Sequence, residues 1–242
     1  MKLANGVHER GILFSGPMVR SLREGRKSQT RRVVKRQPPD DVGVCGASFD
    51  AADRKWAWHD DDGNAGLVTA VEPRFTCPYG VPGDRLWVRE TWRPEFDGRD
   101  HYIQYRAGGT LQPDDRSLQN EIACLVRSDG TDNWQGPRAM DGDSLAWRPS
   151  LFMPQWMSRV LLEVVSVRVE RVQGISEADA IAEGLDHMPP SMFSPPGGGS
   201  WMPHDAAFEL LWDSINAGRG YAWKDNPWVW VVGFKRVDRE GM

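Results

Sequence analysis

The sequence predicts an α+β fold, a small β-barrel with short flanking helices and long loop insertions. Two patterns lead to this prediction: many short segments rich in β-branched residues, and only a few short segments with helical periodicity. The strands and helices do not alternate as in βαβ units, which argues against a doubly wound parallel sheet. The 242 residues are 40% hydrophobic and 26% charged, which is typical of a globular protein with a sizeable core.

The first predicted elements are a short helix followed by a strand. Ser15 can cap the helix, and Gly25 can end it in a left-handed conformation. Residues 29–35 then alternate as a strand, so that Lys27 and Thr30 flank a helix-to-strand turn. Alternation puts Thr30, Arg32 and Val34 on one face of this strand and Gln29, Arg31 and Val33 on the other.

The same patterns predict the later elements. A second helix is well signalled, because Ser176 can cap it and an acidic residue, Asp179, follows three positions on. We expect one domain over 1–242 with insertions at about 37–75, 94–146 and 186–204. The other predicted elements are a hairpin around Trp56 and Trp58, strands at 85–92 and 102–105, one bent strand or two strands in 158–172, a flexible loop at 188–203, a helix at 205–216 and a last strand at 227–237.

The net charge of −4 is distributed unevenly along the chain. The segment from Arg20 to Arg36 holds eight Lys or Arg residues and one acid, Glu24, so it carries +7 and the rest of the chain −11. A concentrated basic segment of this kind is typical of a site that binds phosphate groups. The sequence therefore permits a nucleotide or nucleic-acid partner despite its acidic average.

The cysteines and histidines predict neither disulfides nor a metal site. Cys45, Cys77 and Cys124 are far apart and odd in number, so we expect free thiols. The five histidines are scattered singly, without the close spacing of zinc ligands, and no cofactor is expected. No stretch approaches the ~18 apolar residues of a membrane span. The first residues lack the apolar run of a signal peptide, so we expect a cytoplasmic protein.

Three motifs occur in a recognisable order: Gly25-Arg26-Lys27-x-x-Thr30-x-Arg32 after the first helix, Gly83-Asp84-x-Leu86 in a strand, and the hydrophobic strand at the end. This arrangement resembles the ASCH family, whose domains are similar in fold to RNA-binding PUA domains. Trp147-Arg148-Pro149-Ser150 and Asn226-Pro227-Trp228-Val229-Trp230 are similar to segments of the larger members, which are common in phage and prophage genomes. The resemblance covers about half of the residues. It implies an ASCH/PUA-like barrel, in the host cytoplasm if the chain is phage-encoded.

The resemblance also implies an activity. Small bacterial ASCH members hydrolyse the amide of N4-acetylcytidine to cytidine and acetate with a lysine, a threonine and a glutamate. The matching positions are Lys27 and Thr30 in the first motif and Glu183 in the second predicted helix, with Glu177 as the fallback and Glu90 as a third candidate. The expected function is therefore that of a hydrolase acting on an N-acylated nucleoside or nucleic-acid base.

Each residue type suits this chemistry. Amide hydrolysis at neutral pH needs an activated nucleophile and a group that protonates the leaving amine. A lysine crowded by other cations has a lowered pKa, so Lys27 can accept a proton from the Thr30 hydroxyl or from water. Glu183 can orient Lys27 or protonate the leaving nitrogen. The residues expected to bind substrate or phosphate are Arg26, Arg31, Arg32, Glu90, Trp92 and Arg148.

A second interpretation stays open at this point. The basic segment can hold phosphates in a non-catalytic RNA- or DNA-binding module, with RNA as the expected partner, or in a ribonuclease. In that case Thr30 is an ordinary strand residue and Glu183 an exposed helix residue. Most of the 12 tryptophans are expected in the core, whereas Trp92, Trp147 and Trp156 flank turns beside arginines and are candidates for a pocket wall.

Overall fold

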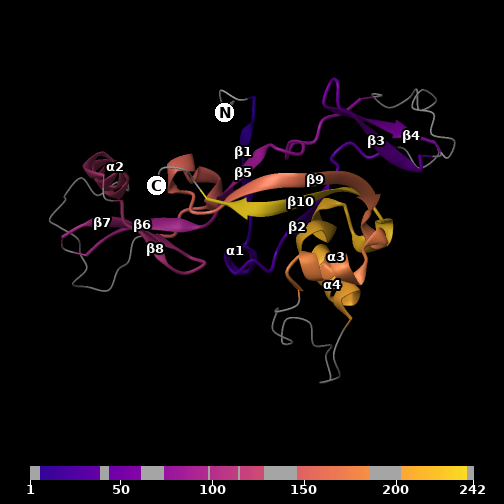
Figure 1. Ribbon diagram of the computed structural model, residues 1–242. Coiled ribbons are helices and arrows are strands. Elements are labelled where there is room, and N and C mark those ends of the chain that lie inside the picture. The colour runs from indigo at the N-terminus through magenta and orange to yellow at the C-terminus, as the bar shows by residue number, and fades with distance from the viewer. Residues whose placement is uncertain are drawn as a thin grey trace, which may run out of the picture. The chain divides into compact units, whose positions relative to one another are not determined.

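A computed structural model of the chain describes residues 6–38, 44–60, 74–97, 99–113, 115–127, 146–185 and 203–238. These residues form a mixed α+β protein with many strands and few helices (Figure 1), which confirms the predicted class. The chain divides into two compact units. The first contains residues 1–10, 24–86 and 162–237, and the second contains residues 11–23, 87–161 and 238–242. The prediction of a single domain stays a prediction.

The longest sheet has five strands in the order β1-β5-β9-β10-β2. β10 (Trp228–Val237) pairs antiparallel with β2 (Gln29–Val33), the edge strand, with Val231 opposite Arg31. β9 (Leu161–Arg171) is one continuous, curved strand beside β10 (Figure 1), as one of the two predicted alternatives has it. The remaining strands of this sheet are β1 (Glu9–Leu13) and β5 (Arg85–Arg89).

Within the first unit, β10 buries both of its faces. Val229 and Val231 pack against α3 (Glu177–Ala182) and α4 (His204–Asn216). The alternate residues, Trp228 and Trp230, contact the tryptophans of a hairpin formed by β3 (Gly46–Asp50) and β4 (Lys55–His59). This is the hairpin predicted around Trp56 and Trp58. The same helices cover the neighbouring edge strand β2 on this side of the sheet, where Val33 packs against the same cluster.

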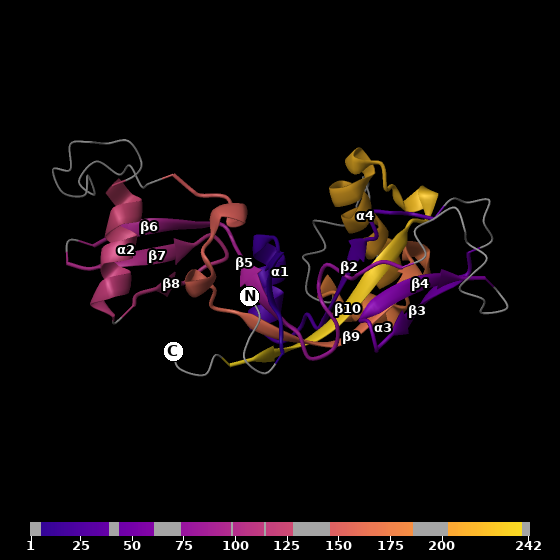
Figure 2. The ribbon, with the colours of Figure 1, turned by 90° about the horizontal axis from the view of Figure 1, so that it is seen from above.

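The second unit contains a small sheet in the order β6-β7-β8, crossed by α2 (Figure 2). Its core combines Ile122 of α2 with Trp92, Ile103 and Tyr105. The sequence predicted one short strand here, at 102–105. Helix α2 was missed, because the sequence around it is polar and rich in turn-forming residues. The bounds are β6 (Trp92–Phe96), β7 (His101–Tyr105), β8 (Thr110–Leu111), α2 (Arg116–Arg127) and, also in this unit, α1 (Gly16–Arg23).

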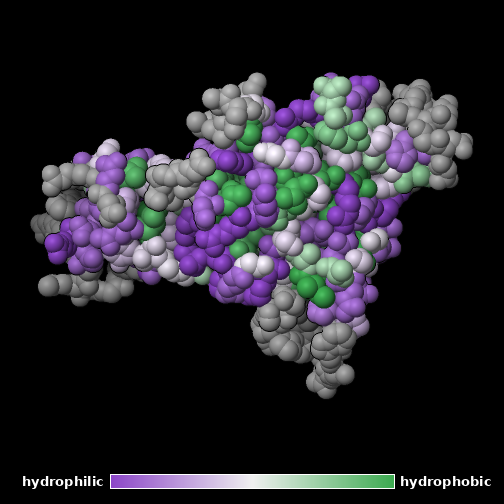
Figure 3. All heavy atoms as spheres, in the orientation of Figure 1, coloured by the Kyte–Doolittle hydropathy of each residue, from purple (hydrophilic) through white to green (hydrophobic). Residues whose placement is uncertain are grey.

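Hydrophilic residues cover most of the face drawn in Figure 3, with hydrophobic residues between them. No helix in the described part of the chain is long and apolar enough to cross a membrane. The predicted flexible loop at 188–203 lies outside the described residues, apart from its last residue, Pro203.

Candidate functional site

The candidate site is built around Lys27, which follows the left-handed residue Gly25 (φ 73°) and precedes β2. The backbone of Ser28 ties this turn to two elements, because Ser28 N–H donates to Ala182 O and Phe234 N–H donates to Ser28 O. Lys27 Nζ donates to Glu183 Oε2 at 2.6 Å and to Glu183 O at 2.8 Å. The side chains of both residues are almost completely buried. A lysine and a glutamate far apart in the sequence thus form one buried pair.

The end of α3 positions Glu183. Ser176 caps the helix by accepting a hydrogen bond from Asp179 N–H, as predicted. One turn later Glu183 N–H donates to Asp179 O, and Gly184 (φ 89°) ends the helix in the left-handed region. Residues four positions apart lie on the same side of a helix. Asp179 and Glu183 therefore both face β2.

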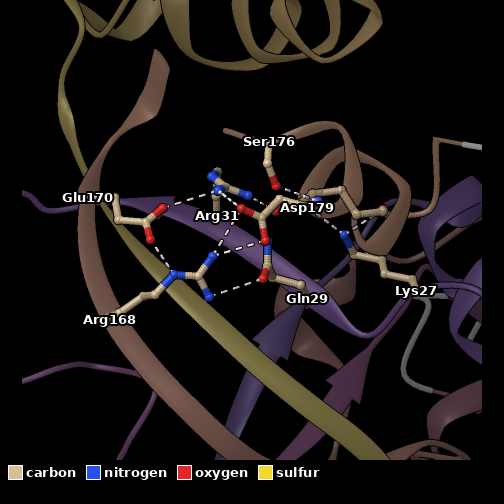
Figure 4. A network of polar contacts seen from close by, with 8 residues as sticks. Lys27, Gln29, Arg31, Arg168, Glu170, Ser176 and Asp179 are labelled. Carbon is tan, nitrogen blue, oxygen red and sulfur yellow. Dashed lines mark hydrogen bonds and ion pairs between the residues drawn. The ribbon is translucent and has the colours of Figure 1, made fainter. Parts of the chain in front are cut away.

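Four charged side chains form a compact network beside the Lys27–Glu183 pair (Figure 4). Arg31 Nη2 donates to Asp179 Oδ2 at 2.9 Å and to Glu170 Oε2 at 3.2 Å. Arg168 of β9 binds both oxygens of Asp179 and also Glu170 Oε1. Arg168 Nη1 reaches Gln29 Oε1 at 3.3 Å. Two cations and two anions therefore alternate, and we call these four residues, Arg31, Arg168, Glu170 and Asp179, the charge quartet.

The quartet approaches the lysine–glutamate pair through Arg31. Arg31 Nη1 lies 4.0 Å from Glu183 Oε1, and the Arg31 side chain is fully buried. Neither of these two atoms has a hydrogen-bond partner in the part of the chain that the structure describes. Most buried polar atoms in proteins have such a partner, so these two atoms, 4.0 Å from each other, depart from the usual pattern.

Burial lowers the pKa of Lys27 below its ordinary value of 10.5, because desolvation disfavours the ammonium form. Glu183 opposes this effect, whereas Arg32 and Arg31 add to it. The sequence analysis expected a lowered pKa from neighbouring cations; the largest cause in the structure is burial. Burial alone would raise the pKa of Asp179, but hydrogen bonds from Arg31 and Arg168 outweigh it and hold that pKa well below the ordinary 3.8.

The other residues expected in the first unit occupy different environments. Thr30 is buried, 3% exposed, and pairs with Val232 of β10. By strand alternation it points to the face opposite Arg31. Arg32 is half-buried, and Arg26 pairs with the exposed Glu24. Arg31 was expected to meet a phosphate; it is instead buried against two carboxylates, which makes it a poor phosphate ligand.

The expected residues Glu90, Trp92 and Arg148 belong to the second unit. Glu90 accepts two hydrogen bonds from Arg159, at 2.7 and 2.8 Å. Trp92 is a core residue, 1% exposed, with the Arg148 guanidinium 5.3 Å from its ring centroid. Trp92 is therefore not exposed for stacking on a base, as a pocket-wall residue would need to be. The fallback carboxylate, Glu177, is exposed and contacts His204.

Sequence reasoning missed three members of the charge quartet as site residues. Asp179 was recognised only for its place in the helix cap, and Arg168 and Glu170 only as part of a strand. The sequence does contain one indication of their role. Arg168 and Glu170 are two residues apart, so they lie on the same face of the β-branched strand, and charged residues on one face of a strand commonly pair with charged residues of a neighbouring element. The partner could not be identified, because β10 separates β9 from β2 in the sheet.

No family model, curated protein or solved structure matches the chain. Among the described residues, no three of His, Cys, Asp and Glu are grouped closely enough to hold a metal ion. The site's chemistry therefore follows from its own contacts. A buried lysine with a lowered pKa beside a carboxylate can accept and return a proton, which is the requirement for general acid–base catalysis.

Proposed function

We propose that the chain is an amidohydrolase of the ASCH type, with a PUA-like barrel, that acts on an N-acylated nucleoside or nucleic-acid base such as N4-acetylcytidine. The observation that carries the proposal is the 2.6 Å contact between Lys27 and Glu183. The resemblance implies both positions, Lys27 through the first motif and Glu183, as the first of three candidate carboxylates, through the second predicted helix. Their meeting in a buried site supports a shared role.

The proposed reaction uses the lowered pKa of Lys27. In its neutral form Lys27 accepts a proton from a water molecule, and the oxygen of that water attacks the acyl carbon. The tetrahedral intermediate then collapses with cleavage of the C–N bond, and the proton returns from Lys27 to the leaving nitrogen. Glu183 holds Lys27 in place through its carboxylate and its backbone carbonyl.

The burial of Lys27 and Arg31 favours this proposal over a phosphate-binding role for these two residues. Lys27 and Arg31 are 3% and 5% exposed, respectively, and both are paired with carboxylates. A surface that binds a nucleic-acid backbone needs cations that reach solvent. Of the basic segment in the first unit, Lys35 and Arg36 are the exposed members. The two most buried cations of the motif are therefore better suited to chemistry than to phosphate binding.

The test is hydrolysis of N4-acetylcytidine and related N-acylated nucleosides, followed by chromatography of the deacylated base. Lys27→Met should lower kcat at least about 100-fold, the usual contribution of a general base. Lys35→Met, which removes an exposed lysine eight positions on, is the matched control and should retain activity. Absence of product with every substrate would overturn the proposal. Salt-dependent RNA and DNA titrations would then test the binding-module interpretation, and cleavage of RNA would identify a ribonuclease.

A further inference from the structure

We propose that Arg31, together with Arg32, helps to set the ionisation of the Lys27–Glu183 pair, and that Arg31 does so as a positioning residue held in place by Asp179 and Glu170. This inference rests on the proposed function for its catalytic meaning, although it concerns proton binding and can be measured without substrate. It assigns Arg31 a role other than contact with the substrate's phosphate.

The geometry places a second cation beside Glu183. Lys27 Nζ contacts Glu183 Oε2 at 2.6 Å, whereas Arg31 Nη1 lies 4.0 Å from the other oxygen, Oε1. When Lys27 releases its proton, an ionised Glu183 loses its closest cation. A buried carboxylate without a nearby cation is strongly disfavoured. Because Arg31 remains charged, it keeps Glu183 balanced and makes neutral Lys27 accessible at lower pH.

The charge quartet fixes this arrangement. Arg31 forms ion pairs with Asp179 of α3 and with Glu170 of β9 (Figure 4). Arg168, which is also on β9, forms ion pairs with the same two carboxylates. Two cations and two anions cancel within the quartet. Arg31 can therefore stay buried and charged without drawing on Glu183 as its main partner. Asp179 lies one helical turn before Glu183, and its carbonyl accepts a hydrogen bond from Glu183 N–H. The ion pairs that hold Asp179 therefore also help to hold the Glu183 backbone.

The groups that face Lys27 support the same conclusion. They are Glu183 from α3 and Arg31 and Arg32 from β2. Burial lowers the pKa of Lys27 most, Glu183 raises it, and both arginines lower it. Arg32 has the larger effect of the two and also interacts electrostatically with Glu183, and Arg31 Nη1 lies 4.0 Å from Glu183 Oε1.

The experiment is an NMR titration of protein labelled with ¹³C at the lysine Cε atoms, with the Lys27 signal assigned by its loss in Lys27→Arg. In Arg31→Met the Lys27 titration should move to higher pH, so that its neutral fraction near pH 7 falls about tenfold. Arg31→Lys, which keeps a charge, should show a smaller shift. Arg168→Met is the matched control, because it removes the other cation of the quartet, for which the described contacts include Glu170, Asp179 and Gln29 but not Glu183.

Two outcomes would overturn the inference: an unchanged Lys27 titration in a folded Arg31→Met protein, or an equal shift in Arg168→Met. If Arg31→Met does not fold, the double variant Arg31→Met/Asp179→Asn removes one cation with one anion and leaves the Arg168–Glu170 pair. It should show the same direction of shift, and no shift would reject the role. A wild-type protein that hydrolyses no acylated nucleoside would reject the proposed function alone, because the titration reads Lys27 directly.

Discussion

Lys27 Nζ lies 2.6 Å from Glu183 Oε2 and 2.8 Å from Glu183 O, across 156 residues of sequence. The first contact is an ion pair and the second a hydrogen bond to the end of α3, so one ammonium group both neutralises a carboxylate and anchors a helix end. The lysine side chain has no exposed surface, and the glutamate side chain is 3% exposed. In a pair buried this deeply, the free energy of burying each charge depends strongly on the presence of the other.

This dependence predicts a large coupling between the two side chains. Glu183→Gln should destabilise the protein by about 3–5 kcal/mol, because it leaves a buried ammonium group without its carboxylate. The double variant Lys27→Met/Glu183→Gln should lose less than the sum of the two single variants. Denaturant unfolding of all four proteins gives the coupling free energy. Additive losses would show that the pair does not act as a unit.

The lowered pKa of Lys27 predicts a pH-dependent stability. Between the lowered pKa of the folded state and the ordinary 10.5, the unfolded state binds more protons at this residue than the folded state does. The free energy of unfolding should therefore rise with pH in that window. Below it, the full cost of burying the ammonium group remains. The measurement is the free energy of unfolding against pH for wild type and Lys27→Met, and a constant difference between them would contradict the prediction.

The lowered pKa of Asp179 predicts how the stability of the protein changes at acidic pH. Its folded-state pKa lies below the ordinary 3.8, so its ion pairs contribute fully above 3.8 and are lost as the pH falls below that value. Asp179→Asn should destabilise the protein at pH 7 and remove part of the acid sensitivity. Glu177→Gln is a suitable control, since Glu177 lies on the same helix but is exposed. Thermal melts between pH 2 and 7 compare the three proteins.

Local patterns predicted local structure, and these predictions succeeded where neighbouring residues decide the outcome. The helix capped by Ser176 and the alternating faces of β2 follow from capping and strand geometry. The charge quartet could not be predicted, because Arg31 meets partners 139 and 148 residues away. Its formation depends on how β9, β10 and β2 are ordered in the sheet, which strand periodicity does not encode. Helix α2 was missed because its surroundings are polar and rich in turns.

The three cysteines predict a simple reactivity pattern. Cys45 and Cys124 are exposed, whereas Cys77 is 4% exposed and burial raises its pKa to about 12. The thiolate is the reactive form, so Cys77 should resist modification at pH 8 while the protein is folded. A thiol reagent such as 5,5′-dithiobis(2-nitrobenzoate) should titrate two thiols rapidly and the third only in denaturant. In Cys77→Ala the rapid phase should be unchanged and the slow thiol absent. A third rapid thiol in the native protein would mean that the turn holding Cys77 opens in solution, since access to a buried thiol requires local unfolding.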